Sequence, residues 1–160
     1  MHRPLFNLIV LILFFFSNTF SQDYSKVVLD NPVKIPITLS GSFAEPRTNH
    51  FHSGIDIRIG GKIGQRVYSP NDGYVSRIKV QAFGGGKNLY ITHNNGYTTV
   101  YMHLDSYSPA IDKYVKEYQY KNKTYEFDIS LQREDIKIKR GDLIAFAGNS
   151  GSSGGPHLHY

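Results

Sequence analysis

Two clusters of metal-ligating residues lie far apart in this chain of 160 residues. Near its end, His157 and His159 are separated by one residue, and an extended segment points such residues to the same side. Upstream, His52 and Asp56 flank Gly54, whose freedom to turn lets both side chains converge on one point. Together they supply three zinc ligands and a spare histidine. Three protein ligands leave one coordination position for water, which is typical of a catalytic zinc site and predicts hydrolysis.

The chain contains no cysteine, so any metal site must be built from histidine and carboxylate. His50 lies two residues before His52 and is a competing candidate for that ligand position. His93 stands between a predicted strand and a turn, and we interpret it as structural. Arg47 and Asn49, just before the first cluster, are candidates for the lining of a cleft.

The first 21 residues have the pattern of a secretory signal peptide. A short basic start precedes an almost unbroken apolar run over residues 5–16, and small polar residues follow up to Ser21. The apolar run is short for a membrane span, although an uncleaved anchor is the alternative interpretation. We therefore expect an exported protein of the periplasm or cell envelope, with membrane contact only through this segment.

The formal net charge of +5 is spread along the chain, without a run of five or six like charges. This pattern is typical of a basic, solvated surface. The more specific alternative is that the surface attracts an anionic polymer such as a cell wall. No known nucleic-acid-binding motif is present, so we expect no nucleic-acid partner.

Composition and turn signals predict a mainly β fold. The sequence has 12 Tyr, 10 Phe and 15 Gly residues, and Tyr and Phe favour strands. After a lead-in over residues 22–36 we expect strands at 37–43, within 67–80 around a turn at 70–73, at 89–93, 97–104, 125–131 and 143–147, with the first histidine cluster on a loop over 48–59.

Three local patterns predict particular elements. Asn95-Gly96 predicts a hairpin that joins 89–93 to 97–104, because this pair suits a turn with positive φ. Alternation along 97–104 would place Thr99, Tyr101 and His103 on one face, polar enough for the floor of a cleft. Ser108 followed by Pro109, with apolar residues at helical spacing, predicts a helix over 108–121.

Three motifs resemble those of the M23 (lysostaphin-type, LytM-like) zinc endopeptidases. They are HSGID at 52–56, YMHL at 101–104 and GPHLH at 155–159, in the family's order and spacing. The resemblance implies a small antiparallel β-sheet domain with a duplicated hybrid motif over residues 37–160. It also implies one insertion with a short helix at about 107–138. Because the family normally continues beyond the last motif, it further implies a chain truncated at its C-terminal end.

The same resemblance implies roles for five residues. His52, Asp56 and His159 would bind Zn²⁺, and His103 and His157 would be catalytic, with their separate roles left open. Zinc lowers the pKa of bound water, and a histidine beside that water can take its proton. No helical HExxH motif that would supply a Glu base is present.

The implied function is exported zinc-dependent hydrolysis of peptide cross-links in bacterial peptidoglycan. The main alternative is a non-catalytic LytM-like scaffold or activator of a cell-wall hydrolase. A biotinyl or lipoyl carrier is a further alternative, disfavoured because no Asp-Lys-Ala or Met-Lys-Met tripeptide is present. The insertion at 107–138 is predicted to shape substrate access or to bind a protein partner.

Overall fold

The computed structural model describes residues 28–48 and 50–160. The predicted signal peptide at 1–21 and the candidate cleft residue Asn49 lie outside the described residues. Within the described part, no helix combines the length and apolarity that crossing a membrane requires.

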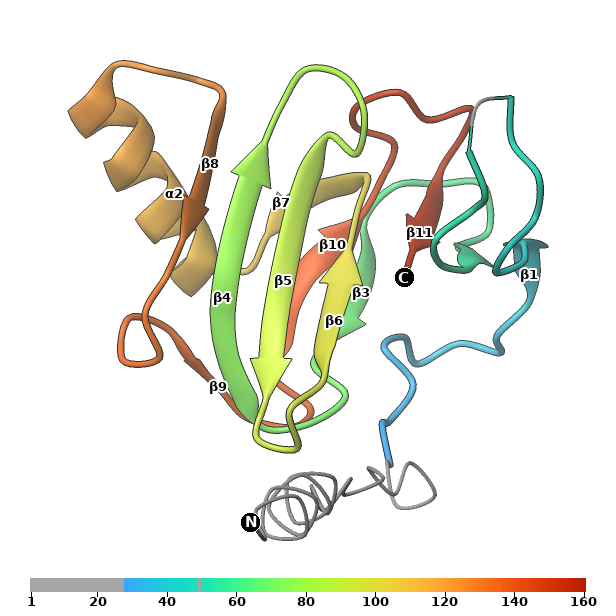
Figure 1. Ribbon diagram of the computed structural model, residues 1–160, viewed down its shortest axis with the longest axis horizontal. Helices are drawn as coiled ribbons and strands as arrows, with labels where there is room; N and C mark the ends of the chain where they lie inside the picture. Colours follow the sequence, from blue (N-terminus) through green and yellow to red (C-terminus); the bar gives the residue numbers. More distant parts are fainter. Residues whose placement is uncertain (1–27, 49) are drawn as a thin grey trace, which may run out of the picture.

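The described chain forms three antiparallel sheets and one helix (Figure 1). A five-stranded sheet has the order β6-β5-β4-β8, with β9 also paired to β4, and two three-stranded sheets have the orders β3-β10-β7 and β1-β2-β11. The elements are β1 (Leu39–Gly41), β2 (Asp56–Arg58), β3 (Gln65–Tyr68), β4 (Gly73–Val80), β5 (Lys87–His93), β6 (Thr98–Tyr101), β7 (Leu104–Tyr107), α2 (Pro109–Asn122), β8 (Phe127–Ser130), β9 (Lys137–Ile138), β10 (Leu143–Ala147) and β11 (His157–His159).

The predicted mainly β fold is confirmed, and its core lies between two of the sheets. In Figure 1, β4, β5 and β6 lie in front of β7, β10 and β3. Alternate residues of β4 and β5, among them Ile78 and Ile91, are buried together with Ile144 and Ala145 of β10. This burial of apolar side chains between two sheets is what holds the layers together.

The hairpin and the helix form where local signals predicted them. β5 pairs with β6 across the turn that contains Gly96, whose φ is +86°. Helix α2 begins at Pro109, and Lys123 follows it in the left-handed conformation. Ile111 and Val115 of the helix are buried in the core, while β8 extends the edge of the large sheet beside β4.

Two sequence predictions are wrong in detail. The expected strand over 97–104 is two strands, β6 and β7, which belong to different sheets. His103 between them has a φ of +59°, a left-handed turn that alternation cannot reveal. Thr99 and Tyr101 are buried, so they do not form a cleft floor. The expected loop over 48–59 ends in a strand, β2, which begins at Asp56.

Candidate functional site

The two histidine clusters meet because β2 and β11 are neighbouring antiparallel strands. His159 lies opposite Asp56, and His157 lies opposite Arg58. Opposite residues share a face of the sheet, so these four side chains point to the same side. Ile57 and Leu158 between them are fully buried on the other side. The tertiary structure thus brings together residues more than 100 positions apart in the chain.

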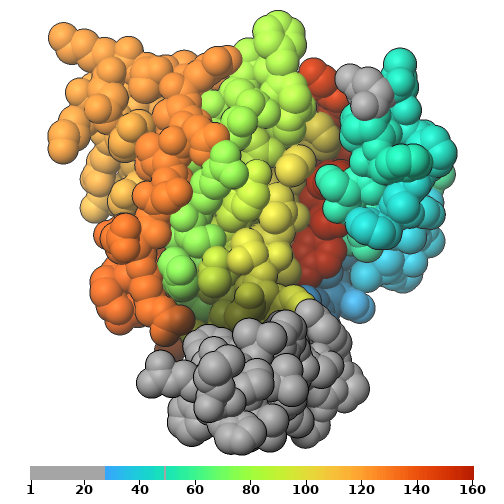
Figure 2. Space-filling view, viewed as in Figure 1, coloured from blue at the N-terminus to red at the C-terminus, as the bar shows by residue number. Residues whose placement is uncertain are grey.

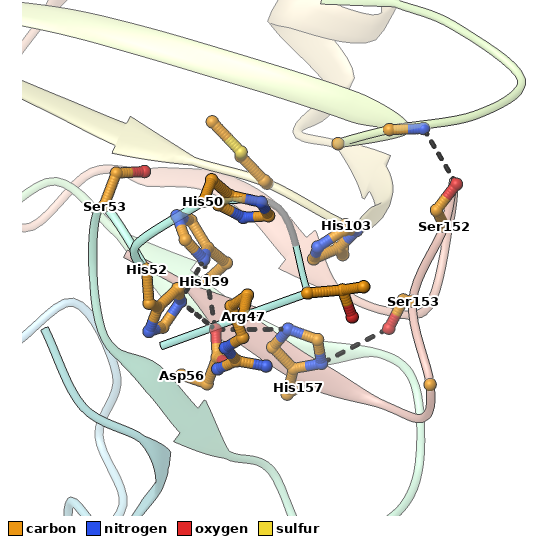
Figure 3. A pocket seen from close by; sticks show the side chains of 15 residues that line it. Arg47, His50, His52, Ser53, Asp56, His103, Ser152, Ser153, His157 and His159 are labelled. Atoms are coloured by element: carbon orange, nitrogen blue, oxygen red, sulfur yellow. Dashed lines mark hydrogen bonds and ion pairs between the residues drawn. The ribbon is translucent and has the colours of Figure 1, made fainter. Parts of the chain in front are cut away.

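The three candidate metal ligands form a tight triangle (Figure 3). His52 Nε2 lies 2.9 Å from His159 Nδ1, and each of these nitrogens lies 3.1 Å from Asp56 Oδ1. Ligand atoms around a tetrahedral zinc ion with bonds of 2.0–2.1 Å are roughly 3.3 Å apart. Two imidazoles and one carboxylate are also a donor set that zinc accepts. The side chains present therefore fit a zinc ion with an open fourth position.

A backbone carbonyl orients His52. Its Nδ1 lies 2.8 Å from the Ser42 carbonyl, which only accepts, so Nδ1 carries the proton and Nε2 offers its lone pair to the triangle. His52 is buried, and its own backbone bonds to Ala44 and Glu45 hold this loop against the chain before it. For His159, burial lowers the pKa against the opposing effect of Asp56, which favours the neutral imidazole that metals bind.

Asp56 divides its two carboxylate oxygens between different partners. Oδ1 is the corner of the triangle next to His52 and His159, while Oδ2 accepts a hydrogen bond of 2.9 Å from Arg47 Nη2. Burial raises the pKa of Asp56, but the nearby His157, His52 and His159 outweigh this effect and lower it. The carboxylate is therefore held ionised. The sequence identified Arg47 as a cleft residue but not as the partner of this carboxylate.

Gly41 is a supporting residue that sequence reasoning missed. A Cβ at this position would lie 2.4 Å from Asp56 Oδ2 and 2.5 Å from Arg47 Nη2. A larger residue at this position would therefore require the ion pair between these two side chains to shift. A glycine inside a predicted strand is a signal for such a close approach, although it does not reveal what approaches.

The two candidate catalytic histidines lie next to each other beside the triangle. The ring centroids of His103 and His157 are 4.9 Å apart, and His103 is 6.2 Å from His159. His103 Nδ1 donates to the Ser150 carbonyl at 2.8 Å, and His157 Nδ1 donates to the Gly155 carbonyl at 2.8 Å. In both rings Nε2 is thus left for other chemistry.

The environment of His103 favours its neutral form. Burial lowers the pKa of its imidazole, and the bond to Ser150 opposes this only in part. A neutral imidazole with a free Nε2 is able to accept a proton. His157 Nε2 lies 3.4 Å from Asp56 Oδ1, which places it directly at the triangle.

An open cleft of about 420 Å³ lies over these residues. Its walls come from the His52 loop, the glycine-rich tip at 84–85 and the loop at 152–154. In Figure 2 the red C-terminal segment lies between the yellow strand and the teal loop. His50 lines the cleft but is not part of the triangle. None of the residues that line this cleft belongs to the insertion at 107–138.

His93 lies outside the site, and its contacts agree with a structural role. It is buried, with Nδ1 at 3.2 Å from the Asp72 carbonyl and Nε2 at 2.8 Å from Thr99 Oγ1. Thr99 Oγ1 in turn lies 3.0 Å from the Tyr101 hydroxyl. This buried hydrogen-bonded chain satisfies the polar atoms of the turn and of β6.

Several known proteins are similar to this chain. The profile of "Peptidase family M23" matches residues 50–123. The peptidoglycan DD-endopeptidase ShyB of Vibrio cholerae is 35% identical over 109 residues, which cover 68% of this chain and 20% of that protein. An uncharacterized metalloprotease of Haemophilus influenzae is 28% identical over 144 residues, 89% of this chain and 25% of that protein. The chain thus spans about a quarter or less of these curated relatives.

Solved structures share the fold. A zinc-containing peptidase from Vibrio cholerae superposes with a TM-score of 0.57 at 28% identity, covering 83% of this chain and 36% of that one. The catalytic domain of lysostaphin from Staphylococcus simulans superposes with a TM-score of 0.51 at 24% identity, covering 76% and 74%, and supports the fold alone. The family match over residues 50–123 and the relatives named as metalloprotease and peptidoglycan endopeptidase show that the chain belongs to peptidase family M23.

Proposed function

We propose that this chain is an exported, zinc-dependent endopeptidase that hydrolyses peptide cross-links of peptidoglycan. The observation that carries the proposal is the triangle of His52, Asp56 and His159, with two further histidines at its edge. The substrate class is supported by relatives named as peptidoglycan DD-endopeptidases. Export is supported by the sequence pattern of residues 1–21.

His52 Nε2, Asp56 Oδ1 and His159 Nδ1 are the atoms that would hold the ion. Bound zinc supplies a water of lowered pKa and polarises the carbonyl of the bond to be cut. The bond from Arg47 to Asp56 Oδ2 keeps Oδ1 turned towards His52 and His159.

We assign the proton transfers to the two remaining histidines. His103 is the general base, because burial favours its neutral form and its Nε2 is free to accept a proton. His157, when both of its ring nitrogens carry a proton, is the donor to the oxyanion or to the leaving amine, because its Nε2 lies at the triangle while its Nδ1 donates to the Gly155 carbonyl. The Ser150 and Gly155 carbonyls hold both rings by their Nδ1 atoms, so neither histidine must reorient during the reaction.

Cleavage of isolated peptidoglycan tests this proposal. The zinc-loaded full chain should release uncross-linked peptides, detected by mass spectrometry. His103→Ala should slow cleavage by about 10²- to 10⁴-fold while retaining zinc, the range for loss of a general base. His52→Ala should lose zinc and activity together. The control is Arg66→Ala, an exposed position on β3 outside the cleft.

The same experiment separates the enzyme from a non-catalytic scaffold. If the zinc-loaded chain leaves peptidoglycan intact and behaves like His103→Ala, the endopeptidase proposal is wrong and the scaffold is favoured.

A protein partner at the insertion is a separate proposal. In Figure 1 this insertion, with α2 and β8, lies on the side of the large sheet away from β11.

A further inference from the structure

A second hollow continues the cleft past His157. It has a volume of about 510 Å³, and Arg47, Asp56, Gly154 and His157 line both spaces. A chain that crosses the triangle can therefore run on into this hollow without leaving the surface. Beyond His157 its walls are formed by Arg58 and by pairs of glycines at 60–61 and 154–155.

Arg58 is the charged group that distinguishes this second hollow. It follows Asp56 by two residues on β2 and lies opposite His157 on β11, so it shares the face that carries the triangle. Two residues along a strand correspond to roughly 6.6 Å. Arg58 therefore lines the second hollow together with Asp56 and His157, which also line the cleft.

The guanidinium of Arg58 is held by a hydrogen bond but is not paired with a carboxylate of the described chain. Its Nε donates to the Leu39 carbonyl at 3.2 Å, which fixes the base of the guanidinium. Within residues 28–48 and 50–160, no carboxylate lies within ion-pair distance of Arg58. Arg47, by contrast, is already paired with Asp56. An anchored, exposed guanidinium of this kind presents its remaining N–H groups as a fork that matches a carboxylate.

We propose that the second hollow is a carboxylate subsite, in which Arg58 binds a free carboxylate of the peptide substrate. The inference rests on the proposed function and names what that site recognises. Because the hollow joins the cleft at His157, the bound carboxylate belongs to the part of the substrate next to the bond that is cut. The glycines at 60–61 and 154–155 carry no side chains, which leaves space for this part of the substrate. The subsite makes the enzyme selective for peptides with a free carboxylate on this side.

The test compares two synthetic cross-linked stem peptides, one with free carboxyl groups and one with the same groups amidated. Arg58→Gln should lower kcat/KM for the free peptide by about 10- to 100-fold, mainly through KM, as expected for a lost bond between charged groups. For the amidated peptide, Arg58→Gln and wild type should have equal kcat/KM. Arg66→Gln, outside both hollows, is the matched control and should behave like wild type on both peptides.

Two outcomes separate the subsite from the proposed function. If Arg58→Gln cuts both peptides with the same ratio of kcat/KM as wild type, the subsite is wrong while the endopeptidase stands. If wild type cuts neither peptide, the endopeptidase is wrong, and titration calorimetry with the same peptides decides the subsite. Tighter binding of the free peptide that Arg58→Gln abolishes supports it, and equal binding of both peptides overturns it.

Discussion

Gly41→Ala should loosen the zinc site from a position that cannot contact the ion. The new Cβ would lie 2.4 Å from Asp56 Oδ2, whereas non-bonded carbon and oxygen atoms rarely come closer than about 3.0 Å. Asp56 Oδ2 must therefore shift by about 0.6 Å relative to the new Cβ, and Arg47 Nη2, which would lie 2.5 Å from it, by about 0.5 Å. Zinc–ligand distances tolerate about 0.2 Å. We expect zinc affinity to fall by about 10- to 100-fold, the usual cost of losing support behind a ligand.

Competition between the protein and a fluorescent zinc chelator measures this change directly. Gly154→Ala is the matched control, because a Cβ there meets no atom within 4 Å and its backbone does not require glycine. Its zinc affinity should equal that of wild type. Asp56→Ala gives the lower limit, and far-UV circular dichroism verifies that each variant is folded.

One result would refute this reasoning. If Gly41→Ala binds zinc as tightly as wild type while Asp56→Ala does not, the Arg47–Asp56 pair does not determine the geometry of the ligand oxygen. The contribution of Arg47 would then have to be sought in substrate binding.

Four further outcomes follow from the structure. Removing zinc with a chelator should lower the melting temperature, because zinc at 100 times its Kd contributes about 2.7 kcal/mol; an unchanged melting temperature contradicts a folded-state site. Hydrogen exchange should increase most in β11, which a bound ion would tie to His52. Burial lowers the pKa of His93, so the unfolded chain takes up the proton first. The contribution of His93 to the free energy of unfolding should be complete above about pH 6.5 and should fall below that pH. In urea unfolding, His93→Gln should weaken the dependence of the unfolding free energy on pH, and an unchanged dependence contradicts the role of His93. The acidic limb of kcat/KM should lie below about pH 6.5, because burial lowers the pKa of His103; a limb above that value contradicts its role as base.

The local parts of the fold were predictable because their signals lie in neighbouring residues. The Asn95-Gly96 hairpin and the helix from Pro109 both form where the turn and capping residues predicted them. The strand over 97–104 was mispredicted, because His103 takes a positive φ and ends the alternation. No local pattern signals such a turn for a histidine, since only the surrounding packing holds it there.

The sequence predicted which residues are candidates for the site, but not the residues that hold them in place. The spacing of His157 and His159, and of His52 and Asp56, gave four candidate residues, and the family resemblance implied which three would bind zinc. The roles of Gly41 and Arg47 were not predictable, because each depends on the distance between side chains from separate segments. The free charge of Arg58 beside the triangle likewise becomes visible only when β2 and β11 are paired.

The sequence by itself determined which atoms are available for chemistry. It contains imidazoles and a carboxylate but no thiolate, and the motifs that resemble the family occur in the family's order. Only the tertiary structure decided that these atoms converge and which oxygen of Asp56 faces the centre. The physical reason is that pairing between strands about 100 residues apart depends on the burial of Ile57 and Leu158 in the core, which no short stretch of sequence contains.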